Sequence, residues 1–349
     1  MMLRYRPLLF TALLIAQALP ASASAITRAA GIEDTPRIAW LDRYQESRQG
    51  PEQTETFTGT YKIEGNGAID LNHIAGDVKV TVGSGNEVRI TAIKRVRHRD
   101  PEEAKRLLSA MRVEVSQVGG RLEIRTVYPR TNNNRGFSGG VDYTITVPQS
   151  AAVAVKTISG NVAVTGVRGE VRAETISGDV DVVSTPNLAY AKAVSGDVRA
   201  RDISASTLTL GTVSGNVIAT SLKVRTLEAG SISGDLRLTD LDVERITAKT
   251  LSGNIDFEGT LARGGRYEFN AHSGNVRLTL PGNTSGFELD ASTFAGTVRT
   301  DFPVTLRTVG TDSNGRRSPS SRTIRGNYGD AASILSLRSF SGSVVIVKR

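Results

Sequence analysis

A four-residue turn, Ser-Gly-Asp/Asn followed by an apolar residue, recurs through the chain and constrains its fold more than any other feature. It begins at seven serines, at intervals of 18, 18, 19, 19, 19 and 21 residues: Ser159, Ser177, Ser195, Ser214, Ser233, Ser252 and Ser273. Looser copies begin at Ala75, Ala295 and Ser341. Self-similarity at a short period is typical of a solenoid, in which each repeat packs against its neighbours.

The residues between the turns favour β-strands. After each turn, apolar and polar side chains alternate, as in residues 198–201, which is the period of a half-buried strand. A coil of 18–21 residues is too short to hold a helix in addition to two or three such strands. Glycine permits the positive φ that a tight corner needs, so we expect the turn glycines to be structural. They are Gly160, Gly178, Gly196, Gly215, Gly234, Gly253 and Gly274.

Two further columns of the repeat precede the turn. A small residue stands two positions before each serine, and a larger apolar residue stands one position before it, except at His272. Because His272 replaces the Ile, Val or Leu of the other coils, we interpret it as part of a packed corner and not as a ligand. The pattern predicts an all-β fold, a single-stranded β-helix (β-solenoid) with about 18–21 residues per coil.

The N-terminal residues have the layout of a secretory signal peptide. Two arginines precede an apolar run, and small residues around Ala23 and Ala25 form a cleavage region. We therefore expect residues 1–25 to be a signal peptide, residues 26–53 to be a polar tether, and the exported protein to be periplasmic or at the cell surface. The apolar run is too short for a permanent membrane span, no later stretch is long enough for one, and cysteine is absent.

The rest of the chain divides into an irregular region and a regular one. Residues 54–148 show the repeat only faintly, and we expect them to form a β entry region that caps the first coil. An Asp-Pro-Glu-Glu segment within it has the composition of a helix N-terminus, which predicts one short helix near residues 101–111. Residues 149–349 are predicted to be the regular solenoid. A basic loop near residues 309–325 interrupts it before the strands near residues 334–347 complete the stack.

Charge is unevenly distributed along the chain. The formal net charge is +8, but the regular coils are close to neutral, which argues against a nucleic-acid-binding stripe along the body. A basic surplus lies in the predicted loop, where Arg316, Arg317, Arg322 and Arg325 form a candidate anion-binding cluster. Its partner would be an anionic envelope lipid, a glycan or another envelope protein. The alternative is a solvated insertion without a partner.

No catalytic, cofactor or metal site is predicted. Asp179 and Asp197 fall on adjacent coils about 5 Å apart, which resembles the carboxylate pair of a retaining glycosidase. Other coils have asparagine in the same column, however, so a role in the turn accounts for every member. The three histidines, His73, His98 and His272, are scattered and show no metal-ligand spacing.

The turn sequences resemble those of the bacterial "putative adhesin" family of β-strand-repeat domains of unknown function. The resemblance rests on the Ser-Gly-Asp/Asn-Val turns, the early Ala-Gly-Asp-Val at Ala75 and the late Ser-Phe-Ser-Gly-Ser-Val at Ser339. It covers roughly residues 55–349 and implies an exported, right-handed β-helix. The family provides no catalytic residues to assign to this chain.

We therefore expect a non-enzymatic, exported β-solenoid that acts as an adhesion or scaffold module at the bacterial cell envelope. Two alternatives remain open. A polysaccharide lyase or hydrolase would place acids and aromatic residues together on one coil face, whereas aromatic residues are only 5 % of the chain. A self-assembling fibre would use the open sheet edges at the solenoid ends, which the entry region and the charged residues Lys348 and Arg349 oppose.

Overall fold

The computed structural model describes residues 51–63, 66–129, 138–306 and 322–349, which belong to one compact unit, Gln49–Arg349. The signal peptide predicted for residues 1–25 lies outside the described residues, as does most of the predicted tether. Residues 52 and 53, assigned above to the tether, already belong to the first strand.

The described residues form one helix, α2 (Pro101–Ala110), and a sheet of 24 strands. The strands are β1 (Glu52–Lys62), β2 (Ala68–Asn72), β3 (Val78–Val82), β4 (Glu87–Arg97), β5 (Arg112–Val118), β6 (Arg121–Val127), β7 (Ser138–Val147), β8 (Ala152–Ser159), β9 (Val162–Thr165), β10 (Val171–Ser177), β11 (Val180–Val183), β12 (Leu188–Ser195), β13 (Val198–Ser214), β14 (Val217–Ser233), β15 (Leu236–Ser252), β16 (Ile255–Gly259), β17 (Arg266–Ser273), β18 (Val276–Leu280), β19 (Gly286–Ala295), β20 (Val298–Thr300), β21 (Thr305–Leu306), β22 (Arg322–Gly329), β23 (Ser333–Ser341) and β24 (Val344–Lys348).

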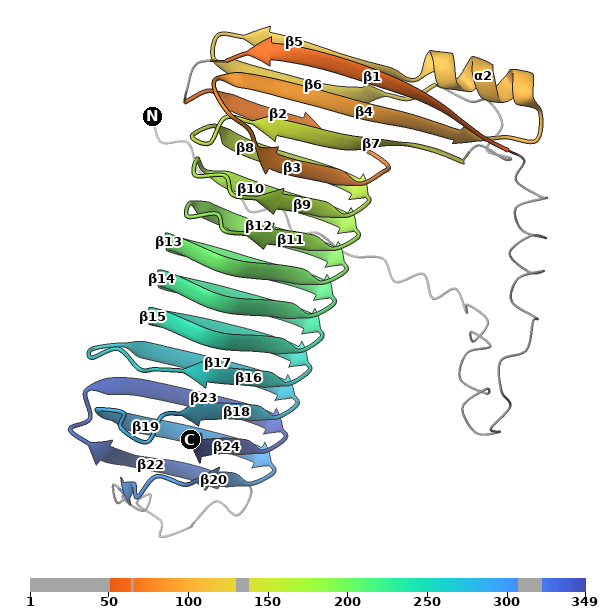
Figure 1. Cartoon of the computed structure of the whole chain (residues 1–349). Coiled ribbons are helices and arrows are strands. Elements are labelled where there is room, and N and C mark those ends of the chain that lie inside the picture. The colour runs from red at the N-terminus through yellow and green to blue at the C-terminus, as the bar shows by residue number, and fades with distance from the viewer. Residues whose placement is uncertain (1–50, 64–65, 130–137, 307–321) are drawn as a thin grey trace, which may run out of the picture. The chain divides into compact units, whose positions relative to one another are not determined.

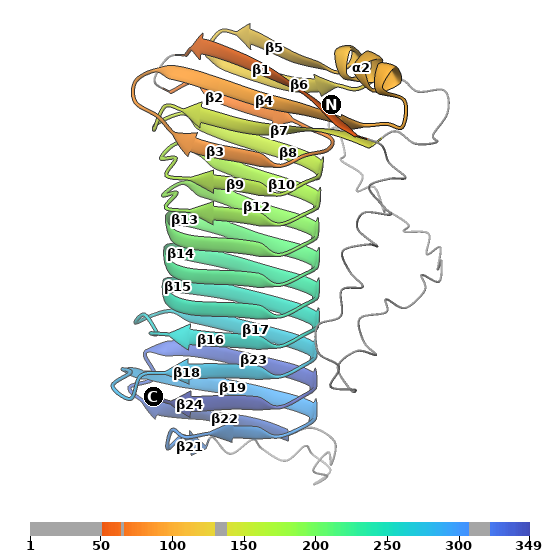
Figure 2. The same ribbon diagram turned by 45° about the vertical axis from the view of Figure 1, so that its right-hand side comes forward.

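The strands stack into a solenoid with two main faces (Figures 1 and 2). Face A contains, in stack order, β5, β6, β2, β8, β10, β12, the second halves of β13 to β15, then β17, β23, β19 and β22. Face B contains β1, β4, β7, β3, β9, β11, the first halves of β13 to β15, then β16, β18, β24 and β20. All pairings between the two ends are parallel, which confirms the predicted all-β solenoid.

Each turn stacks on the turn of the neighbouring coil. The glycines of the seven regular turns have φ between 137° and 156°. A Cβ at Gly234 would clash with the carbonyl oxygen of Gly215, so both the backbone conformation and the close approach require glycine. The next side chain binds the following coil: the Oδ1 atoms of Asp197 and Asn216 accept from the N–H groups of Asn216 and Asp235, at 2.8 and 3.0 Å. Since Asp and Asn both provide this acceptor, either residue can occupy the position.

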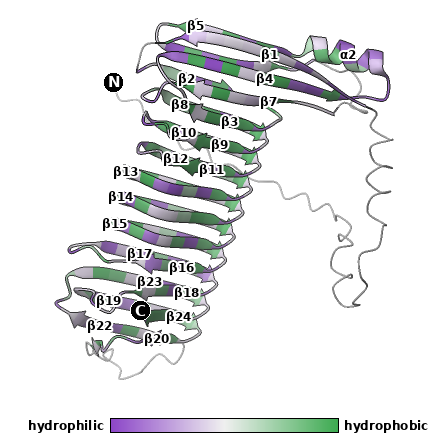
Figure 3. Ribbon diagram, in the orientation of Figure 1, coloured by the Kyte–Doolittle hydropathy of each residue, from purple (hydrophilic) through white to green (hydrophobic). Residues whose placement is uncertain are grey.

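The core lies between the two faces and consists of the inward side chains of every coil. Val198, Leu208 and Leu210 of one coil, for example, are at most 1 % exposed. The small residue two positions before each turn serine also points inward. In one coil the hydroxyl of Thr250 donates to the carbonyl oxygen of Gly234, one coil away, at 3.1 Å. Figure 3 shows the resulting alternation of hydrophobic and hydrophilic residues along the strands.

The N-terminal end is closed by antiparallel strands. β4 pairs with both β1 and β7 in this way, and β5 pairs likewise with β6. Helix α2 lies beside these strands (Figure 1) and packs through Ala104, Leu107 and Leu108. Its N-cap is Asp100, whose carboxylate accepts from the backbone N–H of Glu102 at 3.0 Å. The edge strands of the first coil are therefore paired.

The C-terminal end departs from sequence order. β23 pairs in parallel with β17 on one side and with β19 on the other, and β24 lies likewise between β18 and β20. The turn at Ser341 therefore stacks between those at Ser273 and Ala295, whereas the order of the repeat places it last. Consecutive elements are usually neighbours in space, so sequence reasoning assumed a simple succession of coils. β22 closes this end by antiparallel pairing with β19.

Candidate functional site

A row of exposed apolar side chains, here called the ladder, runs along face A one residue before the turn of each coil. Nine of the thirteen exposed large apolar residues in the described part of the chain belong to it, with exposed fractions of 42–53 %. At a strand spacing of about 4.8 Å it extends over about 43 Å. In stack order it contains Ile74, Ile158, Ile176, Val194, Val213, Ile232, Leu251, His272, Phe340 and Phe294.

The ladder points outward because of the two-residue period of the strands. In β8 the inward residues are Val153, Val155 and Thr157, so Ile158 faces solvent. The interpretation of His272 as part of a packed corner is therefore wrong, because the same period exposes its ring. Continuing the alternation to the end of each strand would have located the ladder from sequence.

A second outward column, here called the polar wall, lies two residues before the ladder, about 7 Å away along each strand. Its five cations and one acid give it a formal charge of +4. The column between wall and ladder points inward, so backbone and small side chains form the floor of a groove. The wall contains Arg125, Asn72, Lys156, Glu174, Lys192, Gly211, Gly230, Lys249, Asn270, Arg338 and Ser292.

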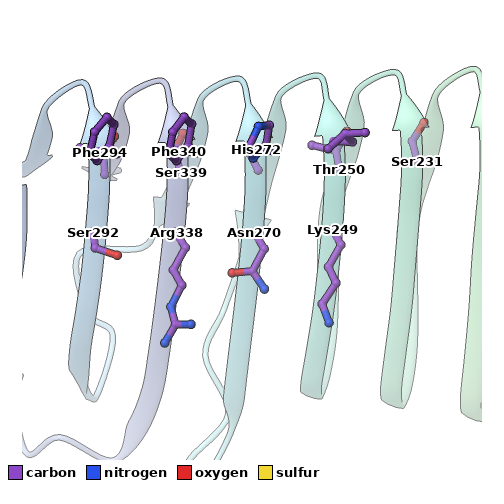
Figure 4. Close-up of a pocket in the computed structure, with 13 residues that line it drawn as sticks. Ser231, Lys249, Thr250, Asn270, His272, Ser292, Phe294, Arg338, Ser339 and Phe340 are labelled. Carbon is purple, nitrogen blue, oxygen red and sulfur yellow. The ribbon is translucent and has the colours of Figure 1, made fainter. Parts of the chain in front are cut away.

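The groove is hollowed in two places. The N-terminal groove, between β6 and β12, has a volume of about 620 Å³. The C-terminal groove, between β14 and β19, has a volume of about 650 Å³. Figure 4 shows the C-terminal groove, with ladder residues near the turns in one row and wall residues in a second row.

Two glycines of the wall, Gly211 and Gly230, separate the grooves. A Cβ at Gly211 would lie 3.8 Å from the carbonyl oxygen of Gly230, and one at Gly230 would lie 3.6 Å from that of Lys249. Both are ordinary van der Waals distances, and neither glycine has a positive φ. The backbone therefore accepts a side chain at both positions, and the gap in the wall is not imposed by the fold.

The ladder is aromatic in the C-terminal groove. The ring of Phe340 stacks on that of His272, with centroids 4.9 Å apart and an angle of 5° between the planes. Its other face stacks on Phe294, with centroids 4.8 Å apart and an angle of 3°. Both faces of Phe340 are therefore covered, and the edges of the rings form the exposed surface. The inserted strand β23 supplies the central ring.

The wall of the C-terminal groove is cationic. Lys249 and Arg338 lie on either side of Asn270 (Figure 4). Lys249 Nζ lies 4.0 Å from the carboxylate of Glu268, the limit of an ion pair, and Arg338 has no ion pair within the described residues. No acid lines the described part of this groove.

The N-terminal groove differs from the C-terminal groove in both its polar wall and its ladder. Glu174 Oε2 lies 3.3 Å from Lys156 Nζ and neutralises one of the three cations of this wall. Its floor includes His73, which is 4 % exposed and whose Nδ1 lies 3.2 Å from Thr126 Oγ1. Burial lowers the pKa of His73 to about 4, so its ring is neutral at pH 7. The ladder here is aliphatic: Ile74, Ile158, Ile176 and Val194.

Asp179 and Asp197, considered above as a possible glycosidase pair, both form ion pairs with one arginine. Arg199 donates to Asp179 at 2.7 Å and to Asp197 at 2.6 Å. The hydrogen bond from Arg199 holds the pKa of Asp179 below its ordinary value. Both acids also accept backbone N–H groups of the following coil. They are engaged in the turn, and the pKa of Asp179 moves away from the raised value that a general acid needs.

The arginines predicted to bind anions do not form a described cluster. Arg316 and Arg317 lie outside the described residues. Arg322 and Arg325 belong to β22, so residues 322–325 are strand and not loop, because they pair with β19. Arg325 Nε lies 3.1 Å from the carboxylate of Asp290, which commits this side chain to a partner within the chain.

Two other kinds of site are absent from the ranges that the structure describes. No group of three or more His, Asp or Glu side chains there is arranged to hold a metal ion. No helix in those ranges is long and apolar enough to cross a membrane. The turn glycines lie at the corner and contribute no wall to the groove.

Three solved structures are similar to the chain at low identity. A "putative adhesin" from Bacteroides fragilis is 14 % identical, with a TM-score of 0.42, and the match covers 84 % of this chain and 97 % of that one. A "putative cell adhesion protein" from Clostridium sporogenes is 11 % identical, with a TM-score of 0.25 and coverages of 85 % and 100 %. A "putative lipid binding protein" from Parabacteroides distasonis is 15 % identical, with a TM-score of 0.39 and coverages of 84 % and 97 %.

The family assignment comes from sequence. A comparison with curated proteins gives no match. Residues 66–330, well over half of the chain, match the model of the family described as Toastrack DUF4097. The parallel coils, the stacked turns and this match lead to one conclusion: the chain belongs to the Toastrack DUF4097 family, a family of unknown function.

Proposed function

We propose that the protein is a non-enzymatic adhesion module of the cell envelope, exported to the periplasm or the cell surface, and that it binds its partner through the groove of face A. The observation that carries the proposal is the ladder, a row of ten exposed side chains of which nine are apolar and about half exposed. Large contiguous apolar patches are rare on monomeric proteins and mark binding surfaces.

The apolar area of the ladder determines how much binding free energy the polar wall has to contribute. Covering the exposed half of each side chain stabilises a complex by about 1 kcal/mol. Nine such residues would contribute about 9 kcal/mol, which is comparable to the free-energy cost of association. The ladder alone would therefore give weak binding, and charged groups of the wall have to add both affinity and orientation.

The scaffold also favours binding over catalysis. The only acid in the wall is Glu174, and it is paired with Lys156. The described walls therefore hold no pair of carboxylates for acid–base chemistry. Hydrogen bonds between successive turns fix the spacing of the coils, so the groove is arranged before a partner arrives, which lowers the entropic cost of binding.

The test measures binding of the purified chain to washed bacterial cell envelopes. The variant Val213→Asp/Leu251→Asp places two charges on exposed ladder positions, so it should fold and lose about tenfold or more in affinity. The matched control, Thr209→Asp/Thr247→Asp, changes outward residues of the same two strands but lies outside the groove. It should bind like the wild type.

Equal binding by the ladder variant and the wild type would contradict the proposal. Release of soluble sugar from envelope polysaccharide by the wild-type protein would instead support the polysaccharide-active alternative. Thermal unfolding of each variant shows whether the coils remain stacked, so that lost binding can be assigned to the groove.

A further inference from the structure

The C-terminal groove combines an apolar wall and a cationic wall, and each matches one part of an amphiphile. We propose that this groove binds a single anionic lipid, whose acyl chain lies along the ladder from Leu251 to Phe294 and whose phosphate lies against Lys249 and Arg338. The inference rests on the function proposed above and names the chemistry of the partner.

The apolar wall fits an extended acyl chain. The rings of His272, Phe340 and Phe294 project from three neighbouring strands about 4.8 Å apart and form one stacked row. Leu251, on the next strand, also lines the groove. A chain of methylene groups in contact with these side chains would remove apolar surface from water along its whole length. Beyond Leu251 the ladder continues to Ile232 and Val213, where the wall residues are glycines. A longer acyl chain would therefore meet further apolar side chains.

The cationic wall fits a phosphate. Lys249 and Arg338 are separated by one strand, and their long side chains extend from the same side of the groove (Figure 4). Arg338 has no ion pair within the described residues, and Lys249 has only the 4.0 Å contact with Glu268. The planar guanidinium of arginine matches the geometry of phosphate oxygens. An anion would therefore meet one cation without an ion pair in the described part of the chain, Arg338, and one with only a long ion-pair contact, Lys249.

Two other partners fit this groove less well. A sugar ring packs against the face of an aromatic ring, where the electron density is negative, but His272 and Phe294 cover both faces of Phe340, so the stack offers ring faces only at its two ends. In a second copy of the chain related by a twofold axis across the groove, the two cationic walls would face each other, and like charges in contact oppose association. An amphiphile avoids both difficulties.

The experiment titrates the purified full chain with a single-chain phosphatidylglycerol, kept below its critical micelle concentration. The comparison lipid is single-chain phosphatidylcholine with the same acyl chain, and calorimetry measures both dissociation constants. We expect saturable binding of the anionic lipid and affinity at least about tenfold lower for the zwitterionic one. Affinity for the anionic lipid should rise with acyl length.

Two variants with matched charge changes locate the site. Lys249→Gln/Arg338→Gln removes both cations of the C-terminal wall and should weaken anionic-lipid binding about tenfold or more. Lys156→Gln/Lys192→Gln removes two cations from the N-terminal wall and should leave this binding unchanged. All four side chains point outward, so both variants should unfold at the wild-type temperature.

Several results would overturn the proposal. Equal affinity for the two lipids would show that the charge of the headgroup does not contribute to binding. Unchanged binding by Lys249→Gln/Arg338→Gln would show that the lipid does not bind at this wall. Equal affinity for inorganic phosphate would show that the acyl chain does not contribute to binding. Binding only to phosphatidylglycerol vesicles would indicate that the partner is a membrane surface instead of a single lipid. If envelope adhesion depends on the ladder but neither lipid binds, the proposed function stands and the lipid assignment fails.

Discussion

The N-terminal and C-terminal grooves occupy the same columns of the repeat but present different surfaces. In the N-terminal groove the ladder is aliphatic, and Glu174 neutralises a cation of the wall. In the C-terminal groove the ladder is aromatic, and no acid lines its described part. The turns at both grooves stack through a glycine at the same position of the repeat. Outward columns can therefore change their chemistry coil by coil, because stacking depends on the turn and the inward residues.

The largest expected effect tests the contrast between these variable columns and the fixed turn. Gly234→Ala introduces a Cβ that clashes with the Gly215 carbonyl at a φ of 156°, so it should lower the free energy of unfolding by about 3 kcal/mol or more. Gly230→Ala, in the wall, meets only ordinary contacts and should be neutral or stabilising by up to about 1 kcal/mol. Denaturant unfolding measures both values. Equal midpoints would show that the turn is no more constrained than the wall.

The second effect concerns the floor of the N-terminal groove. Burial lowers the pKa of His73 from 6.5 to about 4. As pH falls between these values, the unfolded state gains a proton that the folded state does not bind, so stability falls by up to about 1.4 kcal/mol per pH unit. The total loss by pH 4 is about 3 kcal/mol. Unfolding of wild type and His73→Gln between pH 7 and 4 measures it.

The informative quantity is the difference in stability between the wild type and His73→Gln at each pH, since other groups titrate in both proteins. The His73→Gln variant should lose less stability than the wild type as pH falls. Parallel curves for the two proteins would mean that protonation of this floor residue does not distinguish the N-terminal groove.

The smallest effect would make the two grooves more alike. Glu174→Gln removes the acid of the N-terminal wall and releases Lys156 from its ion pair. Exposed ion pairs contribute at most about 1 kcal/mol, so affinity of this groove for an anionic single-chain lipid should rise by about fivefold or less. Calorimetry would detect the gain as additional binding. If none appears, the aromatic ladder and not the wall charge separates the two grooves.

Sequence reasoning succeeded where the chemistry is local. The turn glycines follow from the conformation that a corner requires, and the occurrence of both Asp and Asn follows from the acceptor that either residue provides to the next coil. The helix N-terminus at Asp100 was likewise visible, because capping involves residues only a few positions apart. The features of the turn also repeat with the coil, so each copy reinforced the others.

The groove was missed for two different reasons. The ladder was visible in the alternation of the strands, but the alternation was not followed to the residue before each turn, and His272 was interpreted as part of a packed corner. The aromatic stack was not visible at all, because it depends on where β23 inserts. No local pattern indicates that Phe340 lies between His272 and Phe294, since simple succession would place His272 and Phe294 on adjacent coils.

The inserted coil links the C-terminal groove to the order of protein synthesis. A ribosome produces the coils before and after the insertion first, and the strands that fill the space between them emerge last. The strand β23 carries both the central ring of the aromatic stack and an arginine of the wall. A nascent chain can therefore stack most of its coils, including the whole N-terminal groove, while the C-terminal groove is still incomplete. The lipid binding proposed for that groove would therefore require that translation has passed β23.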